Sequence, residues 1–145
     1  MKLPDVVSAF FLSSENLSSS VLEMSEKCGF SQEEAKIVEK RVLERENLFS
    51  TYYSDEVIVP RAITEKRELI LCAGVLKKSF VYFEDEIRIV FLLLYPKDKK
   101  ADYLYVLSSL YRILSSKQFI AKLAANESEE DLKNNIMKAL HEIES

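Results

Sequence analysis

The sequence is poor in glycine, because Gly29 and Gly74 are the only two among 145 residues. Average usage of about 7% would predict roughly ten. Loops that hold phosphate groups with backbone amides, such as the Walker and dinucleotide-binding loops, need several glycines at fixed spacing. Nucleotide binding through a loop of this kind is therefore excluded by composition.

Cysteine is equally scarce. Cys28 and Cys72 belong to no CxxC motif and to no cluster of histidine and cysteine, so a metal site is not indicated, and no cofactor is expected. Two isolated cysteines are most simply interpreted as small buried thiols in a reducing cytoplasm.

Long hydrophobic runs and excess positive charge are also missing. The longest apolar run, Ile89 to Tyr95, is far below the roughly 18 residues that a membrane span needs. The first twelve residues contain a brief apolar stretch, but Asp5 interrupts the basic region and no A-x-A-like cleavage site follows, so secretion is not expected. The net charge of -4 and the pI near 5.2 argue against nucleic acid as a partner. We expect a cytoplasmic protein without membrane insertion.

A chain of this length with 48% hydrophobic residues can form one core and is too short for two ordinary domains, so residues 1–145 are predicted to be a single domain. Two near-continuous apolar runs, 69–75 and 87–95, predict strands buried on both faces. The short β-branched run 57–59 precedes Pro60, and 77–86 is predicted to add an edge or hairpin strand.

Helical spacing predicts five helices around these strands. The first is short and ends at Gly29, and the second begins at a capping box, Ser31 to Glu34, and runs to about Asn47. Arg45 then falls on or beside the inward stripe of that helix. Three more helices are predicted at 104–114, where Leu104, Leu107, Tyr111 and Leu114 share one face, at 117–125, and after a capping box that starts at Ser128. The predicted fold is α/β with an α+β-like order: a mixed sheet of about four to five strands flanked by helices.

Four segments of the chain follow the order and spacing of one known protein family. Arg45-Glu46 followed by Leu48 matches R-E-x-L, Ser50-Thr51 and Val57-Ile58-Val59-Pro60 match parts of L-G-S-T-G-I-G-x-G-I-A-I-P-H, Val90 to Pro96 matches V-F-L-L-L-x-P, and a leucine-rich helix follows at 102–114. These segments resemble the enzyme IIA domains of the fructose/mannitol class of the bacterial sugar phosphotransferase system, including the nitrogen-regulatory relatives. The resemblance covers most of the chain and implies their fold.

In that family a histidine nitrogen takes a phosphoryl group from a phosphorylated carrier protein and passes it to a sugar-transport IIB domain, or keeps it as a regulatory mark. The resemblance puts Arg61 at the position of this histidine. Arginine has five donors, no acceptor and a pKa above about 12, so Arg61 cannot be the phospho-acceptor. The signature glycines correspond to Phe49, Tyr52, Ser54 and Glu56, and the second family histidine aligns with Tyr103 or Asp102.

The resemblance implies a binding site that contains Arg45, Arg61, Ser50 and Thr51. Arg45 matches the family arginine that neighbours the phosphohistidine, so two guanidinium groups are expected in one surface pocket, where they would bind a phosphate or carboxylate group. Alternatively, carboxylates pair with them and the pocket is a relic; the candidates are Glu46, Asp55 and Glu56.

The leading hypothesis is a regulatory, IIA-like pseudoenzyme that binds a phosphocarrier protein, a sensor kinase or a transporter subunit. A second hypothesis is an active phosphoryl carrier that uses another acceptor, such as His141, which is expected to face solvent, or a hydroxyl of the loop 50–53. A third is an anion-binding module built on Arg45 and Arg61. A homo-oligomer through Tyr52 and Tyr53 is also possible, because exposed tyrosines are common in interfaces.

Overall fold

The computed structural model describes residues 3–4, 7–48, 52–54 and 56–144. Six strands form one mixed sheet in this part of the chain, with five α-helices and one 3-10 helix around it. The elements are β1 (Ser8–Leu12), α1 (Leu17–Lys27), α2 (Gln32–Leu48), β2 (Tyr52–Ser54), β3 (Val57–Ile58), β4 (Arg61–Thr64), β5 (Ile70–Tyr82), β6 (Asp85–Pro96), η1 (Lys97–Lys99), α3 (Lys100–Leu114), α4 (Lys117–Ala124) and α5 (Glu129–Glu144).

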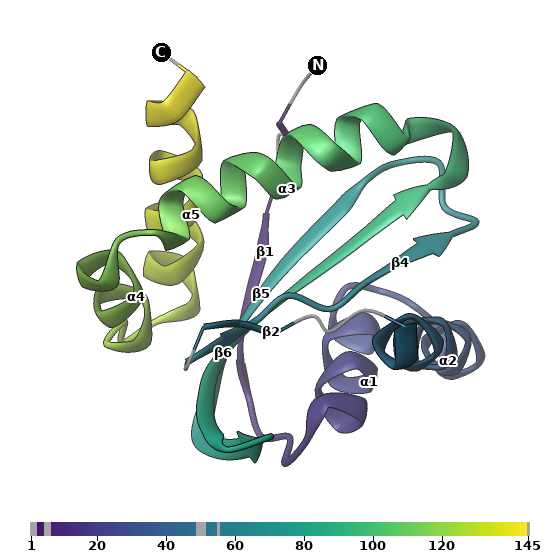
Figure 1. The fold of residues 1–145 in the computed structure, drawn as a ribbon, viewed down its shortest axis with the longest axis horizontal. Coiled ribbons are helices and arrows are strands. Elements are labelled where there is room, and N and C mark those ends of the chain that lie inside the picture. Colours follow the sequence, from purple (N-terminus) through teal and green to yellow (C-terminus); the bar gives the residue numbers. More distant parts are fainter. Residues whose placement is uncertain (1–2, 5–6, 49–51, 55, 145) are drawn as a thin grey trace.

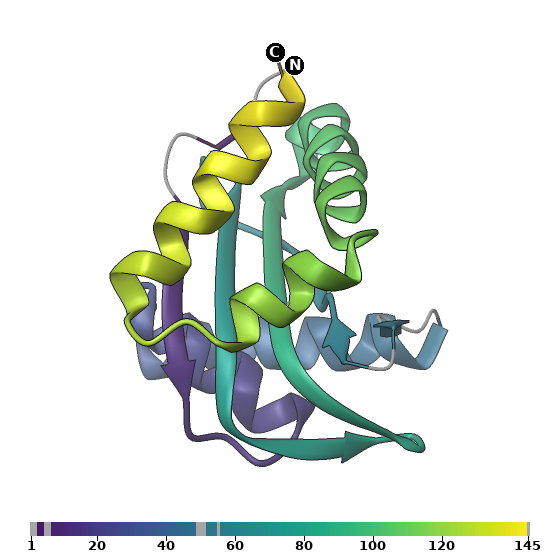
Figure 2. The same ribbon diagram turned by 90° about the vertical axis from the view of Figure 1, so that its left-hand side faces the viewer.

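The sheet is built around the antiparallel pair of β5 and β6. Its order is β1-β5-β6-β3-β2, and β4 pairs with β6 beyond the end of β3. β1 runs parallel to β5, while β3 and β4 both run parallel to β6. The register of β5 against β6 shifts between Val75 and Phe80, and Figure 2 shows the two strands curving together toward their hairpin. A bulge of this kind bends a pair of strands.

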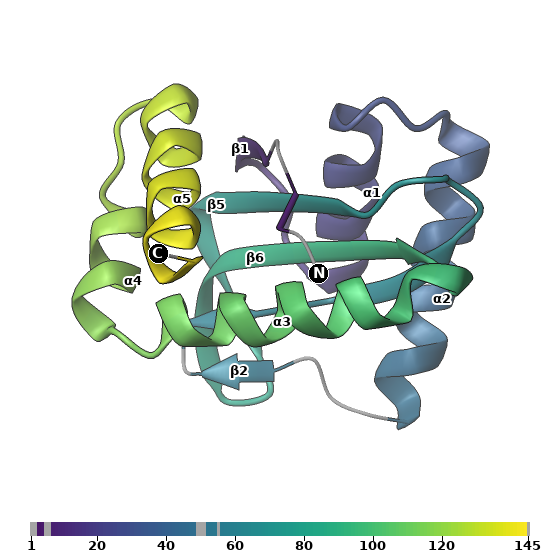
Figure 3. The ribbon, with the colours of Figure 1, turned by 90° about the horizontal axis from the view of Figure 1, so that it is seen from above.

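Helices cover both faces of the sheet (Figures 1 and 3). α3, α4 and α5 lie on one side, and α1 and α2 lie on the other. Each face has its own hydrophobic core, one formed with the C-terminal helices and one with α1 and α2. The apolar runs in β5 and β6 are buried on both faces, as their continuous hydrophobicity predicts.

The helix signals in the sequence have the predicted roles. Gly29 lies directly after α1 with φ +99°, a conformation that glycine adopts without strain. The hydroxyl of Ser31 accepts a hydrogen bond from the Glu34 amide at 3.1 Å, and the Glu34 carboxylate accepts one from the Ser31 amide at 2.9 Å. The backbone amide of Ser31 lowers the pKa of Glu34, and the hydrogen bond from Lys66 lowers it further. None of the helices in the described ranges is long and apolar enough to cross a membrane.

The structure differs from the prediction at the sheet and on α3. The predicted four to five strands become six. β1, β2 and β4 are short strands that their own residue patterns do not mark, and the strand predicted at 77–86 is not separate, because its two ends belong to β5 and β6. On α3 the buried face begins at Tyr103, Val106 and Leu110, whereas Leu104 is 51% exposed. The predicted stripe was therefore wrong at its first position, where Tyr103 takes the inward place expected for Leu104, whereas Leu114 is buried and Leu107 and Tyr111 pack half-buried against the core.

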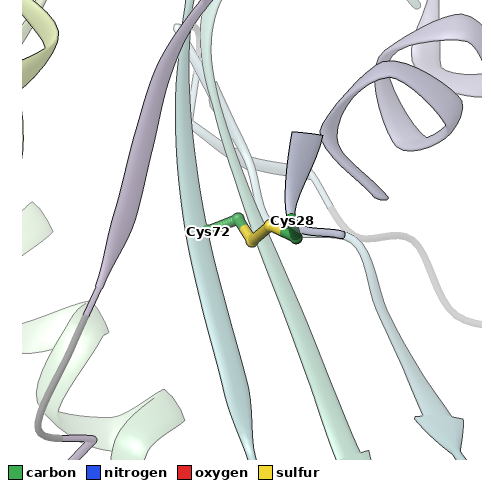
Figure 4. The surroundings of a disulfide bond; sticks show 2 residues. All are labelled: Cys28 and Cys72. Carbon is green, nitrogen blue, oxygen red and sulfur yellow. A yellow bond between two sulfur atoms is a disulfide. The ribbon is translucent and has the colours of Figure 1, made fainter. Parts of the chain in front are cut away.

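The interpretation of the cysteines as free thiols was also wrong. Cys28, at the end of α1, and Cys72, in β5, are joined by a disulfide that ties the helical layer to the central strand (Figure 4). Their Cα atoms are 7.5 Å apart, beyond the roughly 4.4 to 6.8 Å that is usual in disulfides. Sequence spacing does not reveal the pair because 44 positions separate the two residues.

Intact-mass spectrometry tests this bond directly. Without reductant, the protein should be lighter by two hydrogen atoms than after reduction. Reduction should lower the free energy of unfolding by about 2 to 4 kcal/mol, because a cross-link restricts the unfolded chain. The Cys28→Ser variant is the control, since reductant should not change its stability further. Equal masses with and without reductant would show that the thiols are free.

Candidate functional site

β4 carries the residues at the centre of the candidate site. Pro60 interrupts the strand that begins at β3, since it has no N–H, but its carbonyl accepts a hydrogen bond from the Leu93 amide at 3.0 Å. The chain therefore stays beside β6 and resumes parallel pairing, with Arg61 opposite Leu93 and Thr64 opposite Pro96. Both β4 and β6 end at this edge of the sheet, next to the connection into α3.

Arg61 is buried and lies next to tyrosine side chains. The residue is only 8% exposed, and its Nη1 donates a hydrogen bond to the hydroxyl of Tyr111 on α3 at 3.0 Å. The ring of Tyr53 stacks on that of Tyr111 with centroids 5.0 Å apart, and the Tyr53 hydroxyl donates to the Tyr111 carbonyl at 3.3 Å. Within the described residues, Arg61 makes no ion pair and its Nε has no hydrogen-bond partner. Among the described residues, the guanidinium is thus held by a phenol and not by a carboxylate.

A second stacked pair lies beside this arrangement. Tyr95, near the end of β6, packs face to face on Tyr103 of α3, with ring centroids 3.9 Å apart and an angle of 12° between the planes. Burial raises the pKa of the Tyr95 hydroxyl and the neighbouring Tyr103 adds to this effect, while the positive charges of Arg45 and Arg61 act in the opposite direction. Both arginines are therefore close enough to Tyr95 to act on the same hydroxyl.

A cavity of about 970 Å³ opens beside these residues. It lies between α2, β4 and the segment that leaves β6. Its wall consists of Arg41, Glu44, Arg45, Leu48, Ala62, Ile63, Thr64, Glu65, Lys66, Arg67, Tyr95, Pro96, Lys97 and Asp98. A smaller cavity of about 180 Å³ shares Arg41, Thr64, Glu65 and Lys66 with it. The volume of the larger cavity is in the range of small-molecule sites.

The structure does not bring the two predicted arginines into one pocket. Arg45 is half-buried on α2 and lines the cavity, which fits its predicted place beside the inward stripe. Arg61 is not part of the cavity wall, because its side chain turns to Tyr111. Tyr95 is the residue that both arginines influence. Ser50 and Thr51, the other predicted binding residues, lie outside the described residues.

The acidic residues proposed as partners are placed as follows. Glu46 accepts a hydrogen bond from the Tyr82 hydroxyl. Glu56 makes no ion pair within the described ranges, and its carbonyl accepts from the amides of Arg88 and Ile89. Asp55 lies outside the described residues. The only histidine, His141, is exposed in the last turn of α5, as expected from its position.

Sequence reasoning did not find Tyr111 and Thr64 as site residues. Tyr111 was assigned to a core stripe of α3, and its partner Arg61 is 50 positions away. Thr64 is 5% exposed, and its Oγ1 has no hydrogen-bond partner within the described ranges. A polar residue that ends a short strand beside a cavity carries no signal in the sequence.

The comparison with protein families agrees with this architecture. Residues 19–139 match the family described as "Phosphoenolpyruvate-dependent sugar phosphotransferase system, EIIA 2". The chain belongs to this family. The match extends from α1 into α5, so it includes β4, the cavity and both stacked tyrosine pairs.

Solved structures of IIA proteins share the fold. The nitrogen regulatory protein IIA-Ntr from Neisseria meningitidis has a TM-score of 0.73 at 17% identity, over 92% of each chain. The mannitol IIA from Escherichia coli has a TM-score of 0.61 at 20% identity, over 90% of this chain and 94% of that one. Comparison with curated protein sequences gave no significant match. At these identities the likeness concerns the fold.

The hydrogen bond between Arg61 and Tyr111 should contribute measurably to stability in this IIA domain. Tyr111→Phe removes the hydroxyl that accepts from Arg61, so the free energy of unfolding should fall by about 1 to 3 kcal/mol, as for hydrogen bonds to charged groups. Urea denaturation measures this. Tyr105→Phe on the same helix is the control, because Tyr105 makes no hydrogen bond to a described residue. Equal losses in the two variants would show that the bond contributes nothing specific.

Proposed function

We propose that this IIA domain accepts no phosphoryl group at position 61 and acts as a regulatory protein-binding module. The proposal rests on one observation, which is that residue 61 is a buried, hydrogen-bonded arginine. The resemblance assigns position 61 to the phospho-accepting histidine, and the residue found there is a buried arginine whose guanidinium donates to Tyr111. A guanidinium has no lone pair available for attack on phosphorus near neutral pH.

Other acceptors have weak support from the structure. His141 is exposed on α5, a helix that packs mainly against β1 and α3. A tyrosine hydroxyl would need a neighbouring base to become a nucleophile. The Tyr53 hydroxyl instead donates a hydrogen bond to the Tyr111 carbonyl. Burial raises the pKa of Tyr53, which disfavours the phenolate. These observations favour loss of phosphoryl acceptance over its relocation.

The binding part of the proposal has support from relatives and from the surface. One similar structure is a complex of mannitol IIA with phosphorylated mannitol IIB from Escherichia coli, with a TM-score of 0.63 at 16% identity over 92% of this chain and 94% of that one. In this protein, Leu48 and Ile63 beside the cavity are 76% and 40% exposed. Exposed apolar side chains next to charged ones are suited to contact with another protein.

A phosphorylation assay tests the first part. The protein is incubated with phosphoenolpyruvate, enzyme I and the phosphocarrier protein of Escherichia coli, and intact mass is measured. No phosphoryl adduct is expected, whereas the mannitol IIA of Escherichia coli should be modified under the same conditions. An adduct that is stable to alkali and labile to acid would refute the proposal. If such an adduct disappeared in His141→Ala, the acceptor would be that histidine.

An interaction assay tests the second part, with the unphosphorylated phosphocarrier protein as the probe. Titration into isotope-labelled protein should shift the amide signals of α2 and β4 near Leu48 and Ile63. Leu48→Asp should weaken binding about tenfold, because it puts a charge into an apolar contact. Val81→Asp is the matched control, since Val81 is 68% exposed on the β5 hairpin. Shifts that are absent, or equal weakening by both variants, would exclude this surface for that partner.

A further inference from the structure

The large cavity has features of a ligand site that are independent of position 61. It opens where the parallel strands β4 and β6 end, and its wall includes Thr64 and Pro96, which are paired with each other. In α/β sheets, ligands bind at the carboxyl ends of strands, where neighbouring connections leave a crevice. Here the crevice is bounded by α2 on one side and by the start of η1 on the other.

The floor of the cavity combines apolar surface with one unsatisfied hydroxyl. Ala62, Ile63, Tyr95 and Pro96 supply the apolar surface. Thr64 Oγ1 is buried and makes no hydrogen bond within the described residues. A buried hydroxyl without a partner costs free energy, so native structures rarely leave one in place without a reason. A ligand that offers a polar atom at this point would remove that cost.

The wall of the cavity carries two exposed positive charges that no carboxylate of the described residues neutralises. Arg67 and Lys97 are exposed, line the cavity and make no ion pair with any described residue. The other cations of the wall differ, since Arg41 binds Glu65 at 2.6 Å, Lys66 binds Glu34 at 2.9 Å, and Arg45 is not without a partner either. Arg67 and Lys97 are therefore the groups available to an incoming anion, while the chain as a whole has a net charge of -4.

The acidic residues of the wall limit what can enter. Glu44 and Asp98 also line the cavity and make no ion pair within the described ranges. They would repel an anion that filled the whole space, and they can accept hydrogen bonds from hydroxyl or amino groups. The cavity is also much larger than a phosphate ion. These facts favour a molecule with one anionic end and a larger body over an inorganic anion.

We propose that this cavity binds a small organic anion, which is a phosphate or carboxylate group carried on an apolar or aromatic body. Arg67 and Lys97 bind the anionic group, and Ala62, Thr64 and Tyr95 contact the body. The proposal goes beyond a protein-binding role, and it does not depend on the loss of phosphoryl acceptance at position 61, because Arg61 is not part of the wall.

Amide NMR titration with phenyl phosphate as the probe tests the proposal. Saturable shifts are expected at residues 62–67 and at the segment that begins with Lys97. Inorganic phosphate, which lacks the body, and benzyl alcohol, which lacks the charge, should each bind at least about tenfold more weakly. Phenylacetate tests the carboxylate class, and the tighter of the two anionic probes identifies the preferred group.

Two double variants decide whether the named cations carry the binding. Arg67→Ala with Lys97→Ala should weaken phenyl phosphate binding about tenfold or more, since it removes both charged donors. Lys77→Ala with Lys78→Ala removes two exposed cations from β5 and should leave the affinity unchanged. The proposal is overturned if neither phenyl phosphate nor phenylacetate gives saturable shifts at the cavity, if the two double variants behave alike, or if inorganic phosphate or benzyl alcohol binds as tightly as the tighter of the two anionic probes. A phosphoryl adduct in the phosphorylation assay would leave this test unaffected.

Discussion

The parallel pairing of β4 with β6 is the constraint on which the candidate site depends. It puts Arg61 beside Leu93, within reach of Tyr111 on α3, and it ends both strands at one edge, where Thr64 meets Pro96. β6 provides a stable edge for this pairing, because it is hydrogen-bonded to β5 along most of its length and its apolar run is buried on both faces. The register of β4 against β6 thus determines both where the cavity lies and where Arg61 is buried.

The tyrosines around Arg61 offset part of the free energy that is lost when its charge is buried. A guanidinium that loses water without a carboxylate partner is destabilising unless other polar groups replace the lost hydrogen bonds. The Tyr111 hydroxyl supplies one such bond, and the Tyr53 ring covers the Tyr111 ring. About two turns earlier on α3, Tyr103 stacks on Tyr95. The space around position 61 is therefore filled by side chains of the chain itself, which is a physical reason why this site does not resemble an open phosphoryl pocket.

Several elements could be predicted because their causes are local or strongly periodic. The capping box at Ser31, the helix end at Gly29 and the continuous apolar run of β6 are examples. β4 could not be predicted, because Arg61-Ala62-Ile63-Thr64 follows a proline and becomes a strand only through its pairing with β6. The same limit applies to contacts across long separations, which are 50 positions for Arg61 with Tyr111 and 44 for the disulfide. Local sequence contains no information on such partners.

The separation of the two arginines changes how the edge of the sheet can work. A single pocket with both guanidinium groups would tie anion binding to position 61, but Arg45 lines the cavity while Arg61 lies behind it. Tyr95 is the link, because its ring lines the cavity and stacks on Tyr103 of α3. α3 also carries the Tyr111 hydroxyl that holds Arg61. A ligand that contacts Tyr95 would therefore reach α3 through one stacked pair, without any chemistry at Arg61.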